Sequence, residues 1–157
     1  MGGQVSYDEG VFVGYRYFQQ NVQTPLFPFG YGLSYTSFRY DRLRVTNLDG
    51  GGDAAAVEVR VRNVGPRTGS AVVQVYVGRL PTTIPTPPRQ LAGFARVTLK
   101  PGQDAPVTVR IPKRVLSYWE QQTQSWVTPA GTTALYVGSS SADNQLTGHL
   151  SLGHARR

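Results

Sequence analysis

Side chains that carry catalytic chemistry are sparse in this sequence. The chain has nine carboxylates, two histidines and no cysteine, so no thiol is available as a nucleophile or a zinc ligand. The histidines, His149 and His154, do not have the spacing of a zinc site. The serine run 139–141 lacks the pattern of a nucleophile elbow, and a polar turn is the simpler interpretation. We therefore expect no metal site and no cofactor.

The carboxylates also lack the arrangement that paired acid–base catalysis needs. Asp8 and Glu9 are adjacent, and adjacent side chains of an extended chain point to opposite faces. Glu58 alternates with valines, which places it on the wet face of a strand. Asp104 and Asp143 lie in turn contexts, where carboxylates accept hydrogen bonds from local backbone donors. The sequence predicts no catalytic residue.

Three aromatic residues in the second half of the chain are candidates for binding a ligand. Tyr118, Trp119 and Trp126 flank a polar stretch, residues 120–125, which is consistent with a hairpin. Exposed rings with an apolar body and a polar tip can stack on sugar faces, so these three form a candidate carbohydrate-binding platform. The alternative, and the simpler interpretation, is that the two tryptophans pair as core or edge anchors of the fold.

A second group of aromatic residues lies before Ser37, where they alternate with proline and glycine without a helical or strand period. Pro25 and Pro28 remove backbone donors, and Gly30 and Gly32 permit turns, so we predict an extended, packed connector. Its rings need a cover, because clustered exposed aromatic side chains mark an interface. The predicted interdomain docking residues are Tyr15, Tyr17, Phe18, Phe27, Phe29, Tyr31 and Tyr35.

After Ser37 the apolar residues recur at every second position, which is typical of strands. Val57, Val59 and Val61 alternate with charged residues and predict a half-buried strand. Residues 72–77 are largely apolar on both faces, which predicts a central strand. Other alternating runs cover residues 38–45, 91–99, 107–111, 135–137 and 146–152.

Turn-forming residues separate these runs, and no segment is long enough for a crossover helix. About seven strands at this spacing predict an all-β fold, an antiparallel β-sandwich of the immunoglobulin or fibronectin type III kind. One helical turn is expected within residues 113–119. Residues 79–89 contain four prolines and are expected to form a loop.

The composition bears on which partners the chain meets. The formal net charge is +7, but the basic residues are dispersed, with no stripe, basic tail or nucleic-acid-binding motif. No run approaches the roughly 20 apolar residues that a membrane helix needs, and the first residues lack the pattern of a signal peptide. We expect neither nucleic acid nor membrane as a partner.

Several strings of residues resemble family 3 glycoside hydrolases, in the order in which that family has them. Residues 7–10 and 13–16 are similar to the end of its second catalytic domain. The string Pro-Leu-Phe-Pro-Phe-Gly-Tyr-Gly-Leu-Ser-Tyr-Thr at residues 25–36 resembles the link into its fibronectin type III-like domain, and it is highly specific. Residues 73–76, 89–94, 99–102 and 136–143 fit that domain itself.

The resemblance implies a C-terminal, non-catalytic accessory domain of an enzyme such as a β-glucosidase or β-xylosidase. It divides the chain into residues 1–37, the connector and the end of the preceding catalytic domain; residues 38–153, the sandwich; and residues 154–157, a tail. The family's nucleophile and acid/base lie upstream of the matched part, so no catalytic residue carries over. The implied partners are the catalytic domains, with oligo- or polysaccharide as an alternative. A secreted or periplasmic parent is usual for such enzymes.

Overall fold

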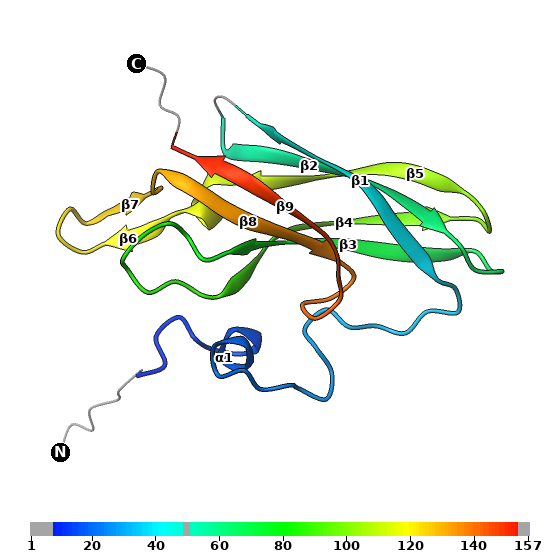
Figure 1. The fold of residues 1–157 in the computed structure, drawn as a ribbon, viewed down its shortest axis with the longest axis horizontal. Helices are drawn as coiled ribbons and strands as arrows, with labels where there is room; N and C mark the ends of the chain where they lie inside the picture. Colours follow the sequence, from blue (N-terminus) through cyan, green and yellow to red (C-terminus); the bar gives the residue numbers. More distant parts are fainter. Residues whose placement is uncertain (1–7, 49–50, 154–157) are drawn as a thin grey trace.

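The computed structural model of the protein describes residues 8–48 and 51–153. The tail predicted at 154–157, with His154, lies outside the described residues, as does the start of the connector region, 1–7. Two antiparallel sheets pack face to face, and the segment before the first strand runs beneath one of them (Figure 1). The predicted antiparallel β-sandwich is confirmed.

One sheet has three strands and the other has four. The first has the order β1-β2-β5, and the second has the order β4-β3-β8-β9. The strands are β1 (Phe38–Asn47), β2 (Asp53–Asn63), β3 (Gly69–Gly78), β4 (Arg89–Leu99), β5 (Asp104–Pro112), β8 (Gly131–Gly138) and β9 (Asn144–Leu152). These are the seven predicted strands, and β3, whose two faces are both largely apolar, is an internal strand, as expected.

The remaining elements are short. A 3-10 helix, η1 (Lys113–Leu116), follows β5 and lies within the range where we expected one helical turn. It leads into a separate hairpin made of β6 (Tyr118–Glu120) and β7 (Ser125–Val127). This hairpin projects from one end of the sandwich, beside the proline-rich loop between β3 and β4 (Figure 1).

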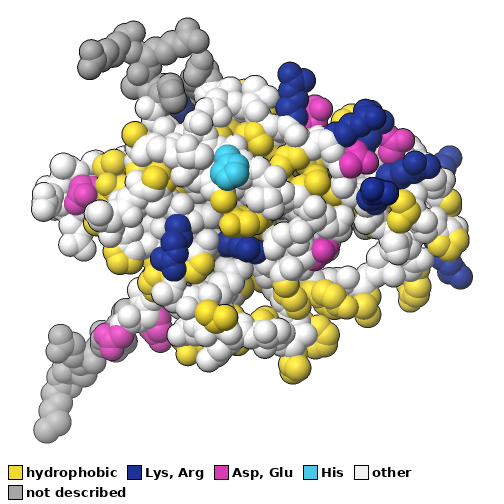
Figure 2. All heavy atoms as spheres, in the orientation of Figure 1, with side chains coloured by type: hydrophobic (Ala, Val, Ile, Leu, Met, Phe, Trp, Pro, Cys, Tyr) yellow, Lys and Arg dark blue, Asp and Glu magenta, His cyan; other side chains and the backbone are white. Residues whose placement is uncertain are grey.

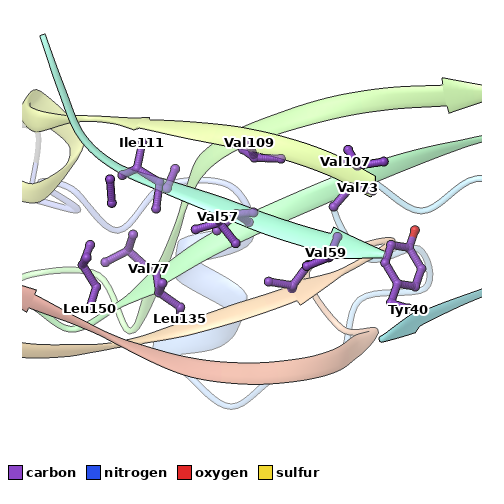
Figure 3. Close-up of a cluster of buried hydrophobic side chains, with 14 of the residues drawn as sticks. Tyr40, Val57, Val59, Val73, Val77, Val107, Val109, Ile111, Leu135 and Leu150 are labelled. Atoms are coloured by element: carbon purple, nitrogen blue, oxygen red, sulfur yellow. The ribbon is translucent and has the colours of Figure 1, made fainter. Parts of the chain in front are cut away.

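The core lies between the two sheets and is built from the inward side of each alternating strand. Val57, Val59 and Val61 of β2 are fully buried, and they face the inward valines of β3 (Figure 3). Because successive side chains of a strand point to opposite faces, the same period places Glu58 and Arg62 in solvent. Burying such side chains contributes about 1.5–3 kcal/mol each before the entropy of ordering is counted.

Two glycines allow the edge strands of the two sheets to approach each other. A Cβ atom on Gly93 of β4 would lie 2.7 Å from the carbonyl oxygen of Arg110 in β5. A Cβ atom on Gly148 of β9 would lie 2.9 Å from a methyl carbon of Leu43 in β1. Both sheet edges are therefore partly covered by the opposite sheet, which limits the open edges available for pairing with other chains.

The connector contains one element that the sequence did not predict, the helix α1 (Tyr15–Gln20). The sequence did not predict this helix because six residues are too few to display a helical period. Gly14, with φ +58, makes the turn into the helix. The Tyr15 hydroxyl, at the first residue of α1, accepts a hydrogen bond from the backbone N–H of Leu91 at 2.8 Å, which ties the helix to β4. No helix of the described residues has the length and apolar character needed to cross a membrane.

Candidate docking surface

The connector is attached to the outer face of the four-stranded sheet by a buried hydrogen-bond network. Gln74 and Tyr76 of β3 point outward from the core, and both are buried because the connector covers them. The Gln74 side-chain amide donates to the carbonyl oxygen of Gly30 at 3.2 Å and to that of Ser139 at 2.5 Å. The Tyr76 hydroxyl donates to Gln74 Oε1 at 2.5 Å. One side chain thus joins the connector, the central strand and the turn after β8.

The backbone conformation of the connector fits this attachment. Gly30 has φ +79, a left-handed conformation that L residues adopt at a cost, and a Cβ atom there would collide with the Gln74 amide. The backbone N–H of Ser141 donates to the carbonyl oxygen of Phe29 at 2.9 Å, directly beside that contact. The connector is therefore positioned by the sandwich itself through at least two backbone contacts.

Aromatic packing strengthens the attachment. The rings of Tyr15 and Phe29 stack with centroids 4.6 Å apart, and Tyr15 meets Tyr76 edge to face at 6.3 Å. Such pairs contribute about 0.5–1.5 kcal/mol beyond the burial of area. Burial, and secondarily the proximity of Tyr15, raises the pKa of Tyr76 well above the ordinary value for tyrosine, which favours the protonated hydroxyl that donates to Gln74.

The other side of the connector exposes large apolar side chains. Leu26, Leu33 and Tyr35 are 95 %, 91 % and 89 % exposed, and Phe27 is 75 % exposed. Figure 2 shows hydrophobic side chains gathered along the lower edge of the molecule, where the connector runs. We call this set the connector patch; its members are Leu26, Phe27, Phe29, Tyr31, Leu33 and Tyr35.

The predicted docking residues therefore divide into two groups. Tyr15 faces the protein's own sheet, and Phe29 shares this packing while remaining partly exposed. Phe27 and Tyr31 lie with ring centroids 5.9 Å apart on the exposed side, together with Tyr35. Phe18 is 37 % exposed and packs edge to face on Tyr17.

Sequence reasoning missed three contributors to this surface. Leu26 and Leu33 are aliphatic, so the prediction from aromatic residues did not include them, although both lie inside the same proline- and glycine-rich string. Gln74 was overlooked as an anchor, although a lone amide in an otherwise apolar central strand needs a polar partner.

The predicted carbohydrate-binding residues lie at the other end of the molecule. Trp119 and Trp126 are direct cross-strand neighbours on the β6–β7 hairpin, with ring centroids 5.6 Å apart and planes at 68°. They are 47 % and 51 % exposed, so they pair with each other without entering the core. With Tyr118 they line a groove of about 410 Å³, which also includes Ile84 and Pro85 of the proline-rich loop. We call it the tryptophan groove.

Several charged groups form local pairs or hydrogen bonds within the sandwich. Arg60 is paired with Asp104 at 2.5 Å, and Arg110 with Asp53 at 3.4 Å, both across the exposed face of the three-stranded sheet. Burial would raise the pKa of Asp143, but hydrogen bonds from Ser139 and from Gln145 outweigh it and lower that pKa. Among the residues that the structure describes, no three His, Asp or Glu side chains gather as a metal site would require.

The chain is similar to known proteins in both sequence and structure. Residues 71–141 match the fibronectin type III-like domain family. Probable β-glucosidase L of Aspergillus fumigatus is 44 % identical over 155 residues, a match that covers 87 % of this chain and 21 % of that protein. The crystal structure of β-D-glucoside glucohydrolase from Trichoderma reesei has a TM-score of 0.90 at 40 % identity, over 96 % of this chain and 23 % of that one. A GH3 β-glucosidase from Bifidobacterium adolescentis gives 0.88 at 35 % identity, over 96 % and 22 %.

The two packed sheets define a fibronectin type III-like β-sandwich, and the predicted resemblance is confirmed. Residues 71–141 match the fibronectin type III-like domain, and the chain as a whole is similar to one part of much longer β-glucosidases, including one of family 3. It spans about a fifth of the length of the relatives that it matches.

Proposed function

We propose that this chain is a non-catalytic accessory domain of a family 3 glycoside hydrolase, and that it docks on the catalytic domains through the connector patch. The observation that supports this most strongly is the exposure of Leu26, Phe27, Leu33 and Tyr35 on a segment that the sandwich holds in place. A contiguous apolar patch of this kind marks an interface in a soluble protein.

The apolar area of the patch favours docking energetically. Full burial of each large apolar side chain contributes about 1.5–3 kcal/mol, so four of them give roughly 6–12 kcal/mol before the costs of association. The connector is already ordered by Gln74 and by the Phe29–Ser141 backbone contact, so little further entropy would be lost on docking. Domains joined in one polypeptide also lose less translational freedom when they dock than separate proteins do.

The exposure of the patch is testable with a dye that fluoresces on apolar surfaces. Changing Leu26, Phe27, Leu33 and Tyr35 together to serine is expected to remove most of the dye signal of the 157-residue chain. The control changes Val64 and Phe94, two exposed apolar residues outside both the patch and the tryptophan groove, to serine. Deleting the whole connector would be a poorer test, because it would also uncover Tyr76. Equal dye binding by both variants would contradict the docking role.

A second candidate function is carbohydrate binding at the tryptophan groove. The specific observation in its favour is that two half-exposed indole rings line a groove of ligand size, between a hairpin and a proline-stiffened loop. Because the rings meet at 68°, they offer a corner for one sugar unit rather than a flat platform for a polymer surface. Titration with cello-oligosaccharide, followed by tryptophan fluorescence, tests this candidate directly; no quenching at high ligand concentration would remove it.

A further inference from the structure

The charged residues of the tryptophan groove are all of one sign. Of the described residues that line it, only Arg16 and Arg114 carry a charge. Neither guanidinium forms an ion pair with a carboxylate within residues 8–48 and 51–153, whereas Arg60 and Arg110 on the three-stranded sheet are both paired. The groove therefore holds two cations that the described residues leave without a counter-charge.

Arg114 stacks on an aromatic wall of the groove, whereas Arg16 lies beside Tyr15, which is not among the lining residues. The Arg114 guanidinium lies over the Trp126 ring, 4.7 Å from its centroid, and that of Arg16 lies 5.9 Å from the centroid of Tyr15. A guanidinium that stacks on a ring keeps its N–H donors at its edge, where a carboxylate can bind two of them in parallel. Gln121, which also lines the groove, is exposed and adds a polar side chain for hydroxyl groups.

We propose that the tryptophan groove binds oligosaccharides that carry carboxylate groups, with the indoles contacting the sugar rings and Arg16 and Arg114 contacting the acid. This inference rests on the second candidate function, and it adds the charge class of the ligand. The groove volume of about 410 Å³ lies within the range of roughly 300–1,000 Å³ that small-ligand sites occupy. An acidic protein segment offers the same charge but lacks the flat sugar faces that two exposed indoles suit.

The test compares three probes on the full chain by calorimetric titration at low salt: a galacturonic acid trimer, cellotriose, and a glutamate-rich peptide of equal charge to the trimer. The acidic trimer is expected to bind about fivefold more tightly than cellotriose, the size of effect that exposed charge pairs give. The difference should shrink at high salt. Arg114→Gln and Arg16→Gln should remove the preference, whereas Arg110→Gln, on the three-stranded sheet, should leave it intact. Trp119→Ala should weaken both sugars.

Each other outcome has a distinct meaning. Equal binding of both sugars would overturn the charge inference and leave carbohydrate binding standing. Binding of neither sugar would overturn both, without bearing on docking through the connector patch. A peptide that binds as tightly as the acidic trimer would overturn the inference in favour of a protein ligand. Arg110, Arg114 and Trp119 are exposed and Arg16 is half-buried. An unaltered urea midpoint for each variant would show that a lost preference does not reflect unfolding.

Discussion

Replacing Gln74 by leucine is expected to loosen the connector from the sandwich. The substitution keeps the approximate volume of the side chain but removes its amide. It leaves the Tyr76 hydroxyl, which is fully buried, without an acceptor, and it takes one donor from each of the carbonyl groups of Gly30 and Ser139.

The expected cost follows from these three contacts. A buried hydroxyl left without a partner costs about 1–3 kcal/mol, and each lost neutral hydrogen bond costs about 1 kcal/mol. Gln74→Leu should therefore lower the free energy of unfolding by about 3 kcal/mol, after allowance for the apolar burial gained. Adding Tyr76→Phe removes the orphaned hydroxyl, so the double variant should be more stable than Gln74→Leu by about 1–2 kcal/mol.

Urea unfolding of the wild type, both single variants and the double variant gives this comparison. Amide hydrogen exchange at Ser141 reports the connector separately, because its N–H donates to the carbonyl oxygen of Phe29. Exchange there should accelerate in Gln74→Leu while the amides of the core strands stay protected. A destabilisation below 1 kcal/mol with unchanged exchange at Ser141 would refute the proposed attachment.

Two further predictions concern the sandwich. Burial, and secondarily the nearby Asp143 charge, raises the pKa of Tyr40 to about 12. The ordinary pKa of tyrosine is about 10. The stability that the protonated Tyr40 contributes is therefore complete below pH 10 and is lost as the pH rises towards 12. Tyr40→Phe should therefore flatten the fall in the urea midpoint between pH 10 and 12, and an unchanged fall would assign it to other groups. Gly93→Val should destabilise the protein by about 1–3 kcal/mol, because its Cβ would approach the carbonyl oxygen of Arg110 to 2.7 Å. Thermal unfolding close to that of the wild type would show that the sheets can separate at this corner.

The strands were predictable from the sequence because apolar and polar residues alternate along them, and this alternation follows which side chains are buried. Val57, Val59 and Val61 lie on one face of β2, and any register that buried their charged neighbours would be costly. The proline-rich loop was predictable for the opposite reason, since four prolines cannot belong to an interior strand. Neither inference required knowledge of the neighbouring strands.

The candidate surfaces were only partly predictable, because they depend on contacts between distant segments. The aromatic string at residues 25–36 indicated an exposed connector, but nothing local showed that Tyr15 would turn inward onto Tyr76. The groove could not be foreseen either, because Arg16 and Trp126 meet there from segments more than 100 residues apart. Tertiary contacts of this kind leave no local period in the sequence.

A chimera tests the docking role most directly. In the chimera, this chain replaces the matching segment of Trichoderma reesei β-D-glucoside glucohydrolase. Thermal inactivation of the β-glucosidase activity is then measured with and without the fourfold serine change at Leu26, Phe27, Leu33 and Tyr35. If the patch holds the domains together, that variant should inactivate several degrees below the unmodified chimera, whereas the Val64 and Phe94 control should not. Identical inactivation of all three chimeras would contradict docking through the connector patch.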